Sequence, residues 1–201
     1  MYIDTPDFLL IRNSIDAKTY KEKLRLRSYG TPNGDDEVFL EIKKKFKGVV
    51  YKRRIKLSVE NAYKYLSEGI RPESSQIMRE IDYAMSFYRD PKPKMLVAYE
   101  RDAYYVKDMP NLRLTFDSNV RYRTDELDLC RGSDGKRIIG DDEYILEIKT
   151  DGAMPLWLSH ALSKLSIYPS SFSKYGYSYR SHTEEHKETT PKGIHTHAHS
   201  V

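Results

Sequence analysis

The chain has 201 residues, of which 39% are hydrophobic and 32% are charged, and its formal net charge is +4. This length allows one domain with a sizeable core, and the modest net charge excludes a histone-like polycation. The single cysteine, Cys130, excludes an intrachain disulfide framework. No apolar run approaches the length of a membrane span. We therefore expect a soluble, cytoplasmic chain without a transmembrane segment.

The first part of the chain reads as strands separated by turns. Residues 1–10 lack the basic segment and apolar core of a signal peptide, and the domain is expected to begin within a strand. Strands are predicted over 19–28, 37–46 and 49–57. A segment rich in Gly, Pro, Asn and Asp separates the first two, and Lys47-Gly48 links the last two tightly. The last two strands are therefore expected to form an antiparallel hairpin.

Two helices follow, and then the strands resume. Ser58 is a favourable N-cap for a helix that runs to about Leu66, with Gly69 as its stop. Apolar residues at helical spacing predict a second helix over 75–87, which Asp90-Pro91 ends. Further strands are predicted over 95–106, 112–122, 126–129 and 144–150.

The C-terminal part changes in composition. A short helix is predicted over 155–165, with Pro in its first turn and its leucines facing the core. The tail contains five of the six histidines and almost no apolar residue. We therefore expect one domain over 1–180 and a disordered, His-rich tail over 181–201. The last three histidines could bind a transition metal loosely, but an unstructured extension is the simpler interpretation.

The expected fold is α+β and mainly antiparallel β. About eight strands that share one polar face are most simply arranged as a closed barrel. A barrel of this size is just wide enough for a slim ligand, such as a triphosphate or a phosphate chain. We therefore predict an eight-stranded β-barrel tunnel with a few flanking helices.

Several predicted strands alternate basic residues with apolar ones. Because successive side chains of a strand point to opposite faces, each strand places its cations on one face. A solvated surface would explain any one strand, but the repetition favours a lumen that binds a polyanion. Arg grips phosphate oxygens through paired N–H donors, and Lys supplies a compact charge. The candidates are Lys23, Arg25, Arg27, Lys43, Lys45, Lys52, Arg54, Lys56, Arg101 and Arg113.

Carboxylates are interspersed among these cations. Glu41 and Glu147 each precede a Lys by two residues, and Asp117 lies in phase with Arg113 on the same predicted strand. Such carboxylates could hold a divalent metal that bridges phosphate oxygens. The alternative is charge pairing between neighbouring strands. We expect Glu147 to be the principal metal ligand and Glu41 to assist it, with Asp117 as a weaker candidate.

Motifs of other chemistries are absent from the sequence. There is no P-loop, no nucleophile elbow, and no zinc-type spacing of Cys and His. The aromatic residues form no clear stacking platform, so no specific nucleic acid is expected as a partner. The segment Ser171–Gly176 places Lys174 in a small, polar context. That segment alone is a weak signal, and a loop that closes the domain would explain it.

Seven motifs carry a resemblance to a known family. They are Tyr-Lys-Glu-Lys-Leu-Arg-Leu-Arg-Ser-Tyr-Gly (20–30), Phe-Leu-Glu-Ile-Lys-Lys-Lys (39–45), Tyr-Lys-Arg-Arg (51–54), Tyr-Glu-Arg-Asp-Ala-Tyr (99–104), Leu-Arg-Leu-Thr-Phe-Asp (112–117), Leu-Glu-Ile-Lys-Thr (146–150) and Phe-Ser-Lys-Tyr-Gly (172–176). In this order they resemble the VTC domain, the polyphosphate polymerase domain of the vacuolar transporter chaperone complex and its bacterial relatives. This domain belongs to the triphosphate tunnel metalloenzymes. The resemblance covers about residues 2–180.

The resemblance implies a tunnel open at both ends. Basic side chains in it would hold ATP, or a triphosphate, and a growing polyphosphate chain, together with a divalent metal, Mn²⁺ or Mg²⁺. It implies that Glu147 holds the metal and that Lys174 lies near the end of the tunnel. Catalytic roles are implied for Arg25, Arg27, Lys43, Arg101 and Arg113. The other substrate-binding residues that we expect are Lys23, Lys45, Arg54 and Lys149.

The implied activity is transfer of the γ-phosphoryl group of ATP onto a polyphosphate chain, with a membrane protein as a potential partner. Two alternatives stay open. The same tunnel could hydrolyse triphosphate or a nucleoside triphosphate, or the domain could be a non-catalytic module that binds polyphosphate or a nucleotide. Family members usually have a helix and a strand before the segment that begins at Tyr2. This chain is therefore expected to lack the first strand of the tunnel.

Overall fold

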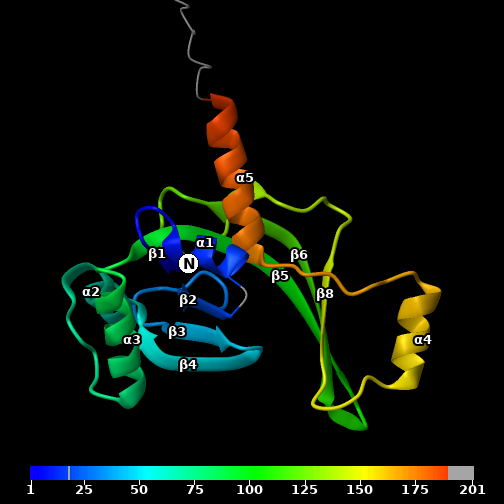
Figure 1. The fold of residues 1–201 in the computed structure, drawn as a ribbon. Coiled ribbons are helices and arrows are strands. Elements are labelled where there is room, and N and C mark those ends of the chain that lie inside the picture. Colours follow the sequence, from blue (N-terminus) through cyan, green and yellow to red (C-terminus); the bar gives the residue numbers. More distant parts are fainter. Residues whose placement is uncertain (18, 190–201) are drawn as a thin grey trace, which may run out of the picture.

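One antiparallel sheet organises the computed structural model, which describes residues 1–17 and 19–189 (Figure 1). The strands are β1 (Tyr2–Asp4), β2 (Tyr20–Arg27), β3 (Glu37–Phe46), β4 (Val49–Ser58), β5 (Lys92–Val106), β6 (Met109–Arg123), β7 (Lys136–Arg137) and β8 (Ile145–Lys149). The helices are α1 (Leu9–Asp16), α2 (Val59–Glu68), α3 (Gln76–Phe87), the 3₁₀ helix η1 (Leu129–Arg131), α4 (Leu156–Lys164) and α5 (Lys174–Thr189). The strand order is β4-β3-β2-β1-β5-β6-β7, and β8 also pairs with β6.

Local sequence signals explain most of these elements. The predicted hairpin is confirmed, because β3 and β4 pair antiparallel. In the tight turn between them, Lys47 and Gly48 adopt positive φ angles of 46° and 88°. Ser58 and Ser75 cap α2 and α3 by accepting hydrogen bonds from backbone N–H groups, at 3.2 and 3.1 Å. Gly69 ends α2 in the left-handed conformation, as predicted.

The N-terminal helix was not expected from the sequence. Asp4 is fully buried, and its carboxylate accepts hydrogen bonds from the backbone N–H groups of Leu10 and Ile11, at 2.8 and 3.0 Å. The Tyr175 hydroxyl of α5 donates to the same carboxylate, at 2.8 Å. One buried carboxylate thus starts α1 and ties it to the last helix.

Three further predictions were wrong in part. Residues 126–129 form a turn and the start of η1 rather than a strand, because the Asp128 carboxylate accepts a hydrogen bond from the Cys130 N–H at 2.9 Å. The predicted helix at 155–165 is confirmed as α4, but only Leu158 is buried, Leu162 is half-buried and Leu165 is exposed. Helix α5 continues through 181–189, where we predicted disorder, while the last three histidines lie outside the described residues.

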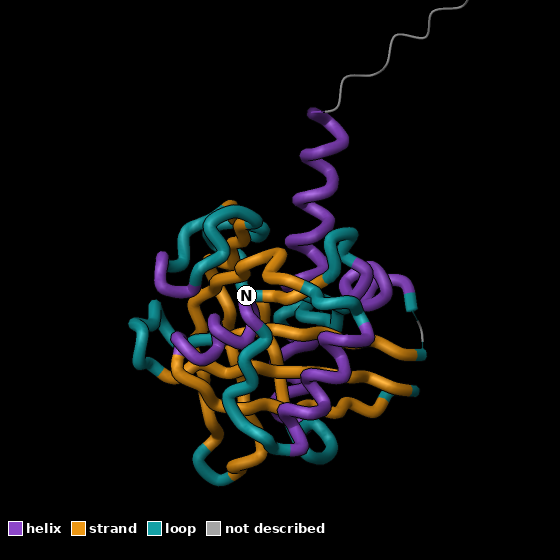
Figure 2. Tube along the Cα trace, turned by 90° about the vertical axis from the view of Figure 1, so that its left-hand side faces the viewer, coloured by secondary structure: helices purple, strands orange, loops and turns teal. Residues whose placement is uncertain are grey.

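The two faces of the sheet differ in chemistry. On one face, inward-pointing residues of β2, β3 and β4, such as Leu24, Leu40 and Ile55, pack with α2 and α3 in the main core. A smaller core, centred on Met95 and Tyr175, joins α1 and α5 to the sheet. This smaller core lies on the other face of the sheet, and the rest of that face carries the basic residues. Figure 2 shows α5 projecting away from the sheet.

The sheet is not closed into a barrel. The α+β class, the eight strands and the antiparallel pairing are confirmed, but within the described residues β4 and β8 each keep one unpaired edge. No described strand bridges these two edges, so the tunnel stays a prediction. Among the described helices, none has the length and apolar character that crossing a membrane requires.

Candidate functional site

The basic face is the face of the sheet opposite the α2–α3 core. Its most unusual feature is a cross-strand row in which Lys23, Lys43 and Lys52 lie directly opposite one another on β2, β3 and β4. Like charges directly opposite in a sheet repel each other. This row therefore needs negative charge from outside itself. The basic face also includes Arg25, Arg27, Glu41, Lys45, Arg54, Lys56, Arg101, Arg113, Asp117, Glu147 and Lys149.

Glu41 is the counter-ion of the first half of this face, which β2, β3 and β4 form. Its side chain is only 1% exposed, and it accepts a hydrogen bond from Arg25 Nε at 2.5 Å. Its other oxygen lies 3.0 Å from Lys52 Nζ and 3.7 Å from Arg27 Nη2. Burial acts to raise the pKa of Glu41, but Arg25 and Lys52 outweigh burial and hold the pKa below its usual value. Three cations thus occupy this carboxylate, and its part as a second metal ligand stays a prediction.

Asp117 is the counter-ion of the second half of the basic face, which β5, β6 and β8 form. It is fully buried on β6, and Arg101 of β5 binds both of its oxygens, at 2.5 and 2.7 Å. Lys174, at the start of α5, contacts the same carboxylate. Burial acts to raise the pKa of Asp117, but the hydrogen bonds from Arg101 and Lys174 outweigh it and lower the pKa. Asp117 is thus a buried counter-ion that fixes two of the predicted site residues.

Glu147 is the accessible carboxylate among the three. Its side chain is 43% exposed, with Lys149 Nζ at 3.2 Å and Arg101 Nη2 at 3.5 Å. The described residues contain no group of three or more His, Cys, Asp or Glu that could hold a metal by themselves. Mg²⁺ commonly binds one or two carboxylates and completes its shell with water and substrate phosphates. Glu147 fits that pattern as a single carboxylate ligand.

The two halves of the basic face lie close enough to influence each other. Burial and Arg25 lower the pKa of Lys43, whereas the Glu147 carboxylate on β8 acts to raise it. Lys23 Nζ donates a hydrogen bond to Ser173 Oγ, just before α5, at 2.9 Å. The structure therefore brings β2, β3, β8 and the start of α5 around one basic surface.

Lys23 has the most perturbed pKa in the lysine row. Burial and then Lys43, Lys21 and Arg25 lower the pKa of Lys23 to about 8. An anion bound at the row would oppose these effects. At pH 8 and above, a bound phosphate should therefore raise the pKa of Lys23 and add a proton to its side chain.

The remaining predicted residues lie towards the ends of the face. Arg113 is directly opposite Lys149, and its guanidinium donates to the Tyr105 hydroxyl at 3.4 Å. Arg54 packs over the Phe39 ring, with 5.0 Å to the ring centroid, and Lys45 lies near the hairpin turn. The sequence placed Lys52 in phase with Arg54 but could not show that Lys52 meets Glu41. That contact is diagonal, because the strand register places Arg54 opposite Glu41 and Lys52 opposite Lys43.

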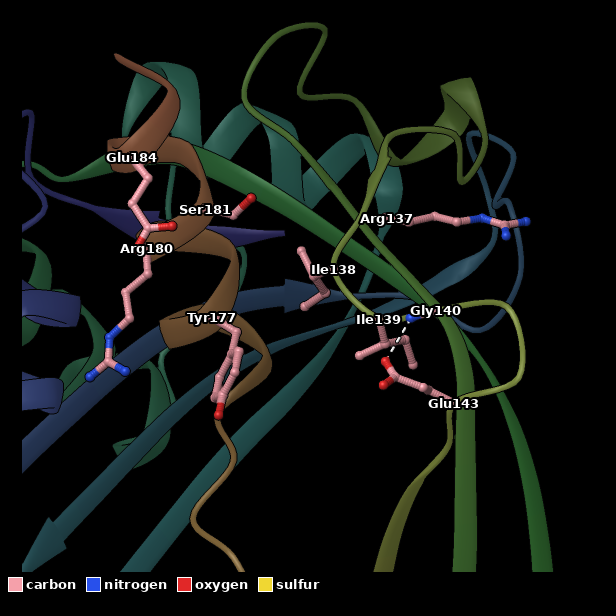
Figure 3. Close-up of a pocket in the computed structure, with 9 residues that line it drawn as sticks. All are labelled: Arg137, Ile138, Ile139, Gly140, Glu143, Tyr177, Arg180, Ser181 and Glu184. Carbon is pink, nitrogen blue, oxygen red and sulfur yellow. Dashed lines mark hydrogen bonds between the residues drawn. The ribbon is translucent and has the colours of Figure 1, made fainter. Parts of the chain in front are cut away.

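Two cavities lie apart from the basic face. The larger, about 490 Å³, lies between α5 and the loop after β7, where the Gly140 N–H donates to Glu143 at 2.7 Å (Figure 3). Figure 3 shows Arg180 and Glu184 on the α5 side of this cavity. The second, about 360 Å³, lies between β6 and the later turns of α5. Neither cavity contains any of the predicted site residues.

The family model described as "VTC domain" matches residues 1–183. No curated protein matches the chain.

We expect Asp117→Asn to destabilise the protein by about 3 kcal/mol at pH 7, because Arg101 and Lys174 lose their buried counter-ion. A depressed carboxyl pKa contributes stability above the unfolded value of about 4, and this contribution is lost as the pH falls through the folded value. The difference between variant and wild type should therefore shrink at pH 3. Urea unfolding at both pH values measures it. Asp102→Asn, on the opposite face of β5, is the control and should change little.

We expect phosphate binding to be coupled to protonation of Lys23. Because its pKa of about 8 should rise when an anion binds, binding at pH 8 should take up protons, and affinity should weaken as the pH rises above 8. Calorimetry with tripolyphosphate in buffers of different ionisation enthalpy measures the uptake. Lys23→Met should reduce it, whereas Lys107→Met, in the β5–β6 turn, should not. Equal uptake in both variants would contradict this assignment.

Proposed function

The chain belongs to the VTC domain family, and we propose that it is a metal-dependent polyphosphate polymerase that uses ATP. One observation carries the proposal. Lys23 and Lys43 lie opposite each other without an ion pair to a carboxylate among the described residues, beside Lys52 and arginines that two buried carboxylates hold in place. Such a surface is suited to a ligand with several negative charges in a line. A phosphate chain has that form.

The proposed reaction needs no protein nucleophile. An oxygen of the terminal phosphate of the chain attacks the γ-phosphorus of ATP, the bond to the β,γ-bridging oxygen breaks, and ADP leaves. Phosphoryl transfer depends mainly on positioning and on stabilising charge on the transferred group. Arg25, Arg27, Lys43, Arg101 and Arg113 would neutralise phosphate oxygens during transfer.

Lysines of the same face would hold the parts of the chain that do not react. Lys23 lies in the lysine row and Lys149 on β8, while Lys174 enters from α5. Glu147 would hold a divalent metal, which when bound adds positive charge next to the transferred group. We further propose that the space between the β4 and β8 edges corresponds to the tunnel of the family.

The direct test follows all products of ATP with Mn²⁺. We expect the purified chain to form long polyphosphate and an equivalent amount of ADP. Glu147→Gln should lower the rate about a hundredfold or more while tripolyphosphate affinity stays within threefold. Glu100→Gln, on the opposite face of β5, should behave as wild type. Free phosphate without polyphosphate would indicate a hydrolase, and tight binding without turnover would indicate a binding module.

The binding surface has its own test. Arg25→Ala should weaken tripolyphosphate binding about tenfold or more, because a charge-assisted hydrogen bond contributes about 1.5–3 kcal/mol. The matched control is Arg53→Ala on β4, because Arg53 points to the other face and lies 3.8 Å from Glu80 of α3. Calorimetry measures both affinities. An unchanged affinity in Arg25→Ala would remove the basis of the proposal.

A further inference from the structure

A pair of histidines on α5 lines the second cavity, apart from the basic face. His182 and His186 are four residues apart, so the helix places them one turn apart on the same side. Their ring centroids are 4.3 Å apart, and the ring planes are nearly perpendicular, at 85°. Disorder was predicted for residues 181–201, and a disordered segment would not hold two such rings together. Helix α5 therefore creates the pair.

We propose that His182 and His186 chelate one divalent transition-metal ion of the class of Zn²⁺, Ni²⁺ and Cu²⁺. Two histidines at this spacing on a helix are a recurring pair of zinc ligands, and imidazole suits all three metals. The site is separate from the proposed Mn²⁺ or Mg²⁺ position at Glu147, where the ligands would be oxygen atoms. It does not depend on the proposed reaction.

The two rings differ in freedom, and this difference suits a chelate. The His182 ring is half-buried and lies 5.9 Å from the Phe8 ring next to α1, which restricts its orientation. His186 is exposed, so its ring can turn and bring one of its nitrogens beside a nitrogen of His182. One fixed ligand and one adaptable ligand can therefore converge on a common ion.

The charges around the cavity also suit a cation. Arg123 and Lys136 line the cavity, and each already contacts a carboxylate of the same cavity. Asp125, on the loop after β6, lines it too and has no ion pair among the described residues. Its charge opposes that of Lys94, which lies 4.8 Å from the centroid of the Phe8 ring. The cavity thus offers a carboxylate without a counter-ion.

The proposal concerns metal binding alone, without hydrolysis. A His-x-x-Glu-His spacing occurs in metallopeptidases, where a glutamate acts as general base. Here the Tyr122 hydroxyl donates to the Glu185 carboxylate at 3.2 Å, and Lys136 contacts the same oxygen. Within the described part of the chain, no three His, Cys, Asp or Glu side chains form a complete metal site. Water would therefore fill the remaining coordination positions.

The test first removes the competing histidines of the tail. In the full chain, His195→Gln, His197→Gln and His199→Gln are combined, and calorimetry with Zn²⁺ should show one site per chain. Adding His186→Gln should weaken binding about tenfold or more, because a single imidazole loses the gain from two linked ligands. His186 is exposed, so its replacement should not disturb folding. The matched control, His160→Gln on α4, should leave the affinity within twofold.

Two further measurements define the site. Mn²⁺ should bind it far more weakly than Zn²⁺, because Mn²⁺ prefers oxygen ligands. Saturating Zn²⁺ should raise the Tm of the tail-substituted chain but not that of the same chain with His186→Gln. The proposal is overturned if the tail-substituted chain binds no Zn²⁺, if His186→Gln leaves the affinity unchanged, or if His160→Gln weakens it equally. None of these readouts involves ATP or polyphosphate, so the proposed function stands or falls separately.

Discussion

Two buried carboxylates are the constraint on which the basic surface depends. Glu41 holds Arg25, Arg27 and Lys52 on one half of the sheet, and Asp117 holds Arg101 and Lys174 on the other. A buried ion pair contributes little net stability when its desolvation is counted. Its effect here is to fix the direction of long, flexible side chains. Without these two carboxylates, the cations would repel each other and turn towards solvent.

This arrangement separates two kinds of cation. Arg25, Arg27 and Arg101 are already paired with buried carboxylates, which restricts the orientation of their guanidinium groups. In the lysine row, Lys52 contacts Glu41, whereas Lys23 and Lys43 have no ion pair to a carboxylate among the described residues. A ligand with several phosphates can supply the missing charge there and meet fixed donors beside it. Fixed donors do not have to reorganise when negative charge develops on the transferred phosphoryl group. Catalysis of phosphoryl transfer depends mainly on such positioning and charge stabilisation.

The basic face also has a direction. Its α2 end combines aromatic rings with arginines, and its other side brings Glu147 and Lys174 near the lysines.

Local sequence was enough to predict the hairpin of β3 and β4, the cap at Ser58, and the side chains that share the basic face. These depend on strand alternation and on hydrogen bonds between near neighbours. The tertiary structure alone decided that Glu41 and Asp117 are counter-ions, that α1 begins on Asp4, and that β4 and β8 each keep one unpaired edge within the described residues. Each of these depends on strand register or on contacts between residues far apart in the chain. The charge pattern of a single strand specifies neither the register of that strand with its neighbours nor the contacts between distant residues.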